Sequence, residues 1–401
     1  MHFQFISSIF DIDAHAWDAT WQTRYPFTQH AFFAALETSH SIHGQTGWQS
    51  CHLLGFDNQK KLCVAMPLFI KTHSYGEYVF DWAWADAYQN NGFNYYPKII
   101  NAIPFTPATG PRIGFADHIS TEEHGALTAQ LIEQIHTKLA DIQGSSFHCL
   151  FPDAQAINVL EKTPMLRREG CQFHWFNQNY TSFDHYLEHF LSRKRKMIRK
   201  ERKKVHALNL HIEMKTAAET DSSDWHTFYA LYHRTYLKRS GRPGYLGKEF
   251  FISLAQSMPD QLVLATVKRD DEIIAGAVYF KDENTLYGRY WGTMEDIDGL
   301  HFETCYYRGI EYAIEHGLQR FDPGAQGEHK IQRGFHSIKT CSYHHLLHDG
   351  FQHAVAEFLV NEKTHNDAYI LDARNYLPFN TEHPHIDSNC VMRSATSTVN
   401  E

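Results

Sequence analysis

Polar and apolar residues alternate along this chain with two different periods, which together predict a mixture of helices and strands. Short runs in which apolar residues are continuous or alternate predict strands, and apolar residues three or four positions apart predict helices. One helix is predicted at 122–142, where aliphatic residues recur every four positions: Leu127, Leu131, Ile135 and Leu139. Another is predicted at 302–316, where a continuous apolar face ends just before Gly317, a residue type common after helix C-termini.

The same patterns divide the chain into two halves with the same order of elements. In the first half, helices are expected at 14–22, 30–39, 95–102 and 122–142, and strands at 49–55, 62–72, 75–84, 146–151 and 171–177. In the second half, helices are expected at 223–239, 248–257 and 302–316, and strands at 261–268, 272–281, 285–292 and 319–322. Helix–helix–strand–strand–strand–helix–strand, used twice, indicates an internal duplication. We therefore predict an α+β fold of two similar halves, 1–178 and 179–401.

The composition is that of a folded protein with room for two hydrophobic cores, since 43% of the 401 residues are hydrophobic. The net charge of −9 argues against general nucleic-acid binding, so DNA is not an expected partner. A chain with this net charge can still carry one local basic patch. The N-terminal segment lacks the basic residues of a secretory signal, and no apolar run reaches the length of a membrane-spanning helix. The seven cysteines form no CxxC pair, which favours reduced thiols and a cytoplasmic location.

Several short segments carry a family resemblance that covers nearly the whole chain. The predicted order of elements resembles the GNAT acyltransferase fold. The segments 301–303 (HFE), 324–330 (GAQGEHK), 333–335 (RGF), 81–86 (DWAWAD) and 104–112 (PFTPATGPR) resemble FemAB-like proteins linked to peptidoglycan biosynthesis, and more loosely CelD-like acyltransferases. The resemblance implies transfer of an aminoacyl group from aminoacyl-tRNA to an amine of a peptidoglycan precursor. It also matches Lys330 to a lysine at the reaction centre of the aminoacyl-transferring relatives.

One motif of ordinary GNAT enzymes is incomplete, and this bears on the acyl donor. Those enzymes hold the pyrophosphate of acetyl-CoA with Arg/Gln-x-x-Gly-x-Gly/Ala, whose glycines let backbone N–H groups approach the phosphates. The nearest match, 289–294 (RYWGTM), breaks at its last position and lies inside a predicted strand. We therefore expect no tightly bound cofactor, with aminoacyl-tRNA favoured over acyl-CoA as the co-substrate.

The loop after the last predicted strand carries groups that acyl transfer to an amine requires. The amine must lose a proton to a base, and the developing oxyanion needs hydrogen-bond donors. Glu328 is a candidate base, and Lys330 and Arg333 are candidates to stabilise a phosphate, a carboxylate or the oxyanion. Gln326 and Gly327 lie in the same loop, where glycine allows close backbone approach to a ligand. A solvated glycine turn before a polar helix is the alternative interpretation.

Residues of the neighbouring elements are expected to border the same cleft. Arg289 and Trp291 lie on the strand predicted at 285–292, which would offer backbone donors and an aromatic wall. His301 and Glu303 begin the next helix and are candidates for catalysis. A carboxylate at a helix N-terminus also has a structural reason of its own, because it favours the positive helix end.

In the first half, carboxylates and indoles gather within six residues. Alternation in the strand predicted at 75–84 would place Trp82, Trp84 and Asp86 on one face and Asp81 on the other. Such a group suits a cationic amine or a sugar-peptide, and buried tryptophan at a strand end is the alternative. Because this half shows no acid-plus-lysine cluster like that of 324–333, we expect it to hold the acceptor, near 81–86 and Arg112.

The segment 193–204 (RKRKMIRKERKK) contains nine basic residues in twelve and predicts an amphipathic helix with a basic face. A solvated linker helix is one interpretation. Contact with a phosphate, with tRNA or with an anionic membrane is the other, and the candidate residues for it are Arg195, Lys196, Arg199 and Lys200.

Other chemical classes find little support in the sequence. The run 344–348 (HHLLH) lacks the glutamate of HExxH and lies in a predicted strand, so no metal site is expected. The Walker A, strand-linked GxGxxG and GxSxG motifs are absent. Three functions stay open: an acyl or aminoacyl transferase acting on a cell-envelope precursor, a GNAT N-acyltransferase or N-acetyltransferase acting on a small-molecule amine, and a non-catalytic module that recognises peptidoglycan fragments.

Overall fold

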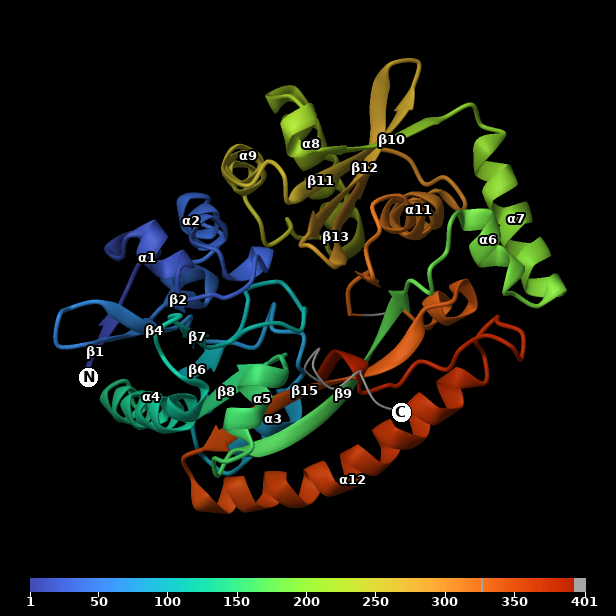
Figure 1. Cartoon of the computed structure of the whole chain (residues 1–401). Helices are drawn as coiled ribbons and strands as arrows, with labels where there is room; N and C mark the ends of the chain where they lie inside the picture. Colours follow the sequence, from blue (N-terminus) through green and yellow to red (C-terminus); the bar gives the residue numbers. More distant parts are fainter. Residues whose placement is uncertain (326, 393–401) are drawn as a thin grey trace. The chain divides into compact units, whose positions relative to one another are not determined.

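The structure, a computed structural model, describes residues 1–325 and 327–392, and the chain forms two compact units (Figure 1). Unit 1 contains Met1–Cys171, Lys339–Ile370 and the described residues 388–392; unit 2 contains Gln172–Ile338 and Leu371–Asp387. The chain thus returns to unit 1 after completing most of unit 2. This division is not the one expected from the sequence, 1–178 and 179–401, because the late segment 339–370 packs with the early residues.

Unit 1 contains two groups of paired strands. In the first, β1 (His2–Ile6), β3 (His52–Phe56), β4 (Leu62–Met66) and β7 (Gly114–Phe115) pair antiparallel in that order. In the second, the order is β15 (His336–Leu346), β8 (Ser146–Leu150), β6 (Lys98–Asn101), β5 (Phe69–Lys71) and β2 (Trp48–Ser50), with only β6 and β8 parallel. The predicted aliphatic stripe of α4 (Thr121–Asp141) is buried in the core of this unit.

Unit 2 is built on one sheet, in which β10 (His211–Thr216), β11 (Leu262–Arg269), β12 (Glu272–Lys281) and β13 (Thr285–Thr293) pair antiparallel. Next to them β14 (Arg320–Asp322) runs parallel to β13 and antiparallel to β9 (Leu166–Phe176). The helices α8 (Ser222–Ser240) and α9 (Lys248–Ser257) lie on one side of the sheet and α11 (Arg308–Glu315) on the other (Figure 1). The predicted helix 302–316 is present, but its first part is α10 (Leu300–Phe302) followed by a π-helical turn, Glu303–Tyr307.

Two sequence predictions in unit 1 are wrong. Residues 75–84 do not form a strand, because the helix α3 (Trp82–Asn90) begins there and buries Trp84 and Tyr88, which are four positions apart. Residues 95–102 do not form a helix, because β6 lies between β5 and β8 with all four of its residues buried. A short, fully buried strand has no polar alternation, so its sequence does not distinguish it from a helix segment.

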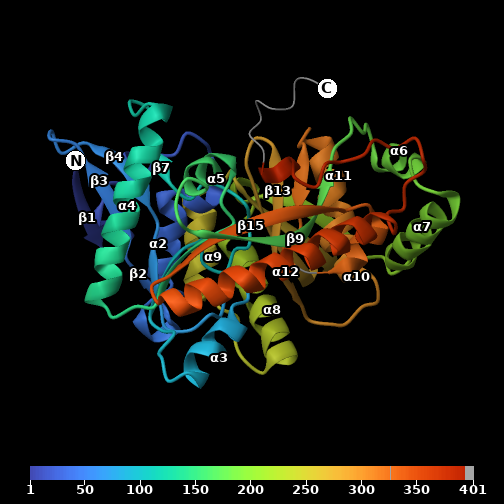
Figure 2. The ribbon, with the colours of Figure 1, turned by 90° about the horizontal axis from the view of Figure 1, so that it is seen from below.

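Four of the remaining α-helices are short: α1 (Ala14–Asp18), α2 (His30–Thr38), α5 (Ala154–Leu160) and α6 (Phe183–Glu188). The two longer ones are α7 (Ser192–His206) and α12 (Asp349–Arg374). Both views show α12 as one long helix (Figures 1 and 2). Within 1–325 and 327–392, no helix combines the length and the apolar character needed to cross a lipid bilayer.

Candidate functional site

The candidate site of unit 2 begins at an interruption in the sheet. Pairing between β13 and β14 covers only Thr285–Tyr287 and Arg320–Asp322, and β13 then continues to Thr293. The pairing of β13 with β12 skips Arg289, since Tyr279 lies opposite Gly288 and Val278 opposite Tyr290. A β-bulge of this kind changes the direction in which backbone and side-chain groups point, and bulges are common beside active sites.

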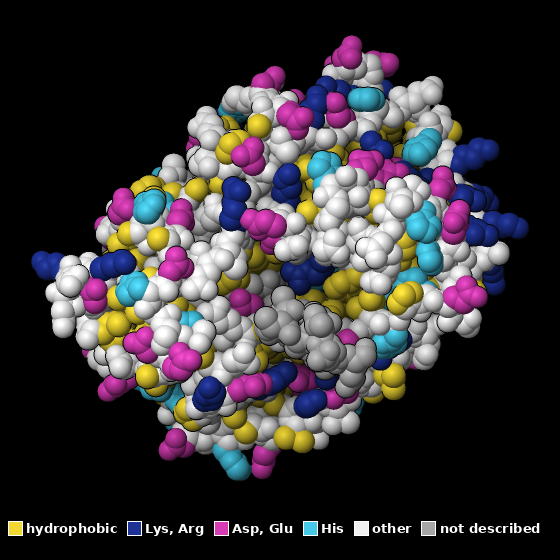
Figure 3. Space-filling view, viewed as in Figure 1, with side chains coloured by type: hydrophobic (Ala, Val, Ile, Leu, Met, Phe, Trp, Pro, Cys, Tyr) yellow, Lys and Arg dark blue, Asp and Glu magenta, His cyan; other side chains and the backbone are white. Residues whose placement is uncertain are grey.

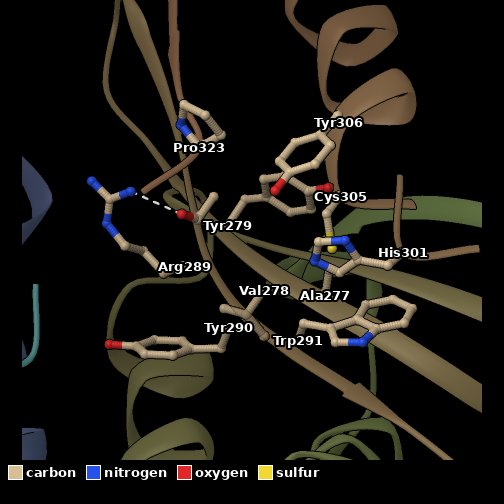
Figure 4. Close-up of a pocket in the computed structure, with 11 residues that line it drawn as sticks. Ala277, Val278, Tyr279, Arg289, Tyr290, Trp291, His301, Cys305, Tyr306 and Pro323 are labelled. Carbon is tan, nitrogen blue, oxygen red and sulfur yellow. Dashed lines mark hydrogen bonds between the residues drawn. The ribbon is translucent and has the colours of Figure 1, made fainter. Parts of the chain in front are cut away.

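A pocket of about 70 Å³ lies beside this irregular part of β13 (Figure 4). It is lined by Ala277, Val278, Tyr279, Gly288, Arg289, Tyr290, Trp291, His301, Cys305, Tyr306 and Pro323. The ring of His301 contacts those of Trp291 and Tyr306 edge-on, with centroids 5.4 and 5.3 Å away. Three residues predicted from the sequence, Arg289, Trp291 and His301, are therefore brought together around one pocket.

His301 can act as a neutral base in this pocket. Burial, reinforced by nearby cations of which Arg239 is the strongest, lowers the pKa of His301 to about 4. At neutral pH the imidazole is therefore uncharged and has a nitrogen able to accept a proton.

Lys330 lies in a 3₁₀ helix, Glu328–Arg333, and its side chain is almost completely buried, with 1% exposure. Its Nζ donates a hydrogen bond to the carbonyl of Gly324 at 2.7 Å and lies 5.9 Å from the ring centre of Tyr306, which lines the pocket. Burial lowers the pKa of Lys330 to about 7. Both the ammonium and the free amine are therefore accessible near neutral pH.

Arg289 is held by a buried carboxylate rather than left open to a substrate. Its Nη2 lies 2.7 Å from Oδ2 of Asp322, whose other oxygen lies 3.5 Å from Nε2 of His174. Burial alone would raise the pKa of Asp322, but the Arg289 guanidinium outweighs it and holds that pKa well below its ordinary value. The pair fixes β14 against the bulge of β13, so Arg289 has a clear structural role.

Glu303 is also occupied by neighbours. It is fully buried and accepts hydrogen bonds from Arg202 Nη2 and Nε, at 2.7 and 3.0 Å, while His206 Nε2 lies 3.1 Å away. Arg202 and His206 belong to α7, so Glu303 joins that helix to the π-helical turn and does not line the pocket. The geometry favours the structural reading of Glu303 over the catalytic one.

The predicted residues of the loop are dispersed by the structure. Glu328 is exposed at the start of the 3₁₀ helix, and Gly327 has a φ of 117°, which favours glycine. Arg333 is buried with its guanidinium 3.7 Å above the ring of Phe302, and it contacts Glu201 at 2.7 Å. Gln326 lies outside the described residues. The loop therefore brings Lys330, but not Glu328, next to the wall of the pocket.

The sequence analysis missed two further residues near Lys330, namely Tyr306 in the lining of the pocket and His329 outside it. Tyr306 lines the pocket, and its hydroxyl hydrogen-bonds to Nε2 of His329 at 3.0 Å. Burial lowers the pKa of His329 to about 4. Tyr306 was counted only as part of the apolar helix face, and the helical pattern alone could not show that its hydroxyl points into a site.

In unit 1, the aromatic-acidic segment is part of a helix and not of a strand. Asp81 precedes α3 and is buried, Trp84 packs edge-on against His344 at 4.8 Å, and Trp82 and Asp86 are exposed. The predicted common face of Trp82, Trp84 and Asp86 is therefore wrong, since helical spacing turns Trp84 inward while Trp82 and Asp86 stay together on the exposed face.

Arg112, the other predicted acceptor residue, is completely buried. Its guanidinium donates to four backbone carbonyls, those of Ala108, Gly110, Pro111 and Leu150. Because four of its roughly five N–H donors are used in this way, the geometry favours a structural role for Arg112 over contact with a substrate.

Unit 1 does contain a cluster of acids and lysines, contrary to the sequence analysis. Lys98 is buried and donates to Asp81 and, at 2.8 Å, to Glu77, while Lys71 lies 3.9 Å from Glu77. The hydroxyl of Tyr95 donates to Asp81 at 2.6 Å. The cluster was missed because its members come from β5, β6 and the loop before α3, which are far apart in the sequence.

The basic segment forms the predicted helix, α7, and its two sides differ sharply. The exposed side carries Arg193, Lys196, Arg199, Lys200, Lys203 and Lys204, which appear as a blue area in Figure 3. Arg195 is half-buried. On the inner side, Glu201 contacts Arg333 and accepts a hydrogen bond from Tyr307, and Arg202 contacts Glu303. The charged residues on the exposed side of α7 are thus all basic, although Arg199 pairs with Asp184 and Lys204 lies 3.6 Å from Asp298. The inner side of α7 is tied to the elements that border the pocket.

Comparisons with known proteins identify the family. The sequence matches the family model FemAB-like, described as peptidoglycan biosynthesis/recognition, over residues 8–381. No curated protein matches the sequence significantly.

Among solved structures, FemX has a TM-score of 0.51 and 12% identity, covering 89% of this chain and 100% of its own. The C-terminal domain of a lysylphosphatidylglycerol synthetase from Agrobacterium fabrum has a TM-score of 0.51 and 10% identity, covering 88% and 97%. A tandem GNAT protein from the clavulanic acid pathway has a TM-score of 0.42 and 6% identity, covering 86% and 98%. The predicted mixture of helices and strands in an α+β fold is confirmed, and the fold is similar to that of FemX.

Proposed function

Because the chain belongs to the FemAB-like family of peptidoglycan biosynthesis and recognition proteins, we propose that it transfers an acyl or aminoacyl group from an activated carrier to an amine, in unit 2. The observation that supports this is the pocket at the bulge of β13. A neutral histidine, His301, lines it, and a lysine with a lowered pKa, Lys330, lies beside it, each within 6 Å of the ring centre of Tyr306. Acyl transfer requires a base, a donor for the oxyanion and a group near the leaving atom, and the pocket can supply all three.

The roles follow from the geometry of the pocket. The acceptor amine attacks the carbonyl carbon of the donor, a C–N bond forms, and the C–O bond of an ester or the C–S bond of a thioester breaks. His301 is the better placed base for the amine's proton, in place of Glu328. Lys330, as the ammonium, stabilises the oxyanion or protonates the leaving oxygen or sulfur, together with backbone N–H groups of β13 beyond Tyr287.

For the donor, we favour aminoacyl-tRNA over acyl-CoA, because the pyrophosphate motif is incomplete at 289–294 and α7 offers a basic surface. For the acceptor, we favour an amine of a peptidoglycan precursor, because the matching family is described as one of peptidoglycan biosynthesis/recognition. Such a reaction would take place in the cytoplasm. Transfer to a small-molecule amine, and recognition of peptidoglycan fragments without catalysis, remain the alternatives.

The test is a transfer assay with charged tRNA or acyl-CoA as donor and UDP-linked peptidoglycan precursors as acceptors. His301→Ala and Lys330→Met are each expected to lower turnover about a hundredfold, because removing one contact to the transition state typically lowers the rate by about that factor. Lys238→Ala is the control, because Lys238 is exposed on α8 and pairs only with Asp296 at the surface. Unchanged rates in both pocket variants would place the reaction elsewhere, and precursor binding without turnover by any donor would support the recognition module.

A further inference from the structure

Three possible metal ligands meet at one end of the four-stranded group of unit 1. They are Asp57, Cys63 and His118, and one ligand atom from each lies within 4.8 Å of the others. Cys63 is buried at the start of β4, Asp57 is half-buried in the turn between β3 and β4, and His118 is exposed in the loop between β7 and α4. None of these residues belongs to the transferase pocket of unit 2.

The distance between the cysteine and the histidine matches the one that a zinc ion would impose. Sγ of Cys63 lies 3.4 Å from Nε2 of His118. With Zn–S near 2.3 Å and Zn–N near 2.0–2.1 Å in a tetrahedral site, these two atoms would lie about 3.6 Å apart. A thiolate, an imidazole and a carboxylate are also the ligand types that zinc takes in proteins.

The backbone holds the three residues in place before any ion arrives. β4 pairs with β3 on one side and with β7 on the other, and the N–H of Ala116 donates to the carbonyl of Cys63 at 2.9 Å. Oδ1 of Asp57 accepts the N–H groups of Gln59 and Lys61, both at 2.8 Å, which fixes its carboxylate in the turn. A site whose ligands are already ordered loses little conformational entropy when it binds a metal.

We propose that Asp57, Cys63 and His118 bind one zinc-type divalent cation, with a fourth position open to water on the side of His118. Binding releases the thiol proton of Cys63 to solvent, so the metal binds as the thiolate complex and more tightly as pH rises. The ion joins the β3–β4 turn to the loop that precedes α4 and stabilises unit 1. The sequence analysis expected no metal site on the basis of the run 344–348 and did not consider these residues. They leave no motif in the sequence, since 55 residues separate Cys63 from His118.

The test uses the full chain, freed of any affinity tag, stripped with EDTA and titrated with Co²⁺ as the spectroscopic probe. We expect a thiolate-to-cobalt charge-transfer band that saturates at one equivalent, is abolished by Zn²⁺, and is accompanied by a Zn²⁺-dependent rise in melting temperature. Cys63→Ser and His118→Ala should lose both signals. Asp57→Asn should weaken binding about tenfold or more, because the amide oxygen keeps the turn but lacks the charge.

Matched controls separate this site from the general affinity of a chain with 29 histidines. Cys171→Ser and His15→Ala change a half-buried cysteine and an exposed histidine elsewhere in unit 1, and both should behave as the unaltered protein. The proposal is wrong if the unaltered protein gives no cobalt–thiolate band, or if the band survives in Cys63→Ser. Melting curves without metal show whether each variant folds, and a folded Cys63→Ser that still gains stability from Zn²⁺ would also overturn it.

Discussion

Among single residues, Lys330 shows most clearly how burial creates reactivity. An exposed lysine is an ammonium with a pKa near 10.4, whereas the surroundings of Lys330 lower its pKa to about 7. The buried charge is disfavoured because it has lost its hydration, and Asp322 offsets this only in part. The same burial that prepares the group for proton transfer must therefore reduce the stability of the folded chain while the group is charged.

Lys330→Met should make this cost measurable. Below pH 7 both the folded and the unfolded chain bind the proton, so the folded state carries the full cost of the buried ammonium. Between pH 7 and about 10 the unfolded chain still binds the proton while the folded chain does not, and stability rises with pH. We expect Lys330→Met to stabilise the protein by roughly 1 to 3 kcal/mol at pH 6, with the gain shrinking towards pH 10. Urea unfolding at several pH values measures it, and a gain independent of pH would contradict the assignment.

Among the elements, α7 shows what periodicity can and cannot predict. The sequence predicted both the helix and its basic face, because nine basic residues in twelve leave few other possibilities. It could not predict that Glu201 and Arg202, in the middle of the basic run, face inward to Arg333 and Glu303. Those partners lie about a hundred residues away, and only the packed structure brings them together.

Mutation of an inward-facing charge of α7 should therefore lower the stability of the fold, whereas mutation of its exposed charges should change that stability little. Arg202→Ala leaves the fully buried Glu303 without its main partner and should cost about 3–5 kcal/mol of stability, measured by urea unfolding. Changing Arg195, Lys196, Arg199 and Lys200 together to Gln should alter stability by less than about 1 kcal/mol.

The same fourfold variant should bind unfractionated tRNA more weakly and with a flatter dependence on salt, as fewer counterions are released. Filter binding at several salt concentrations measures both quantities. An unchanged salt slope would leave α7 as a solvated linker helix.

For the whole molecule, the sequence predicted the fold type but not the path of the chain. The repeated order of elements and the stripe of α4 were enough to indicate two similar halves. The late return of the chain to unit 1 left no such signal, because Cys341 and Tyr343 of β15 look like any buried strand residues. Likewise, Lys98 and Arg112 could be identified as buried, and hence structural, only once their neighbours were known.

A fragment comprising 1–178 should consequently fail to fold alone, although it contains every element predicted for the first half. It lacks the segment of β15 that pairs with β8, Ser342–Leu346, and the core side chains of Cys341 and Tyr343. We expect no cooperative unfolding transition by circular dichroism. The same fragment joined by a flexible linker to 339–392 should regain one, and cooperative unfolding of 1–178 alone would show that the sequence-based boundary defines an autonomous domain.

The order in which the ribosome synthesises these segments affects how the chain folds in the cell. All of 172–338 emerges before Lys339–Ile370, so unit 2 has nearly its whole sequence available while unit 1 still lacks a strand of its sheet. Until β15 is synthesised, the edge of β8 in the first 171 residues stays unpaired. Unpaired strand edges and exposed apolar surface favour aggregation. Nascent chains of this protein are thus expected to need chaperone protection of residues 1–171 until Lys339–Ile370 has been synthesised, and a premature stop near 338 would leave unit 1 without a strand of its sheet.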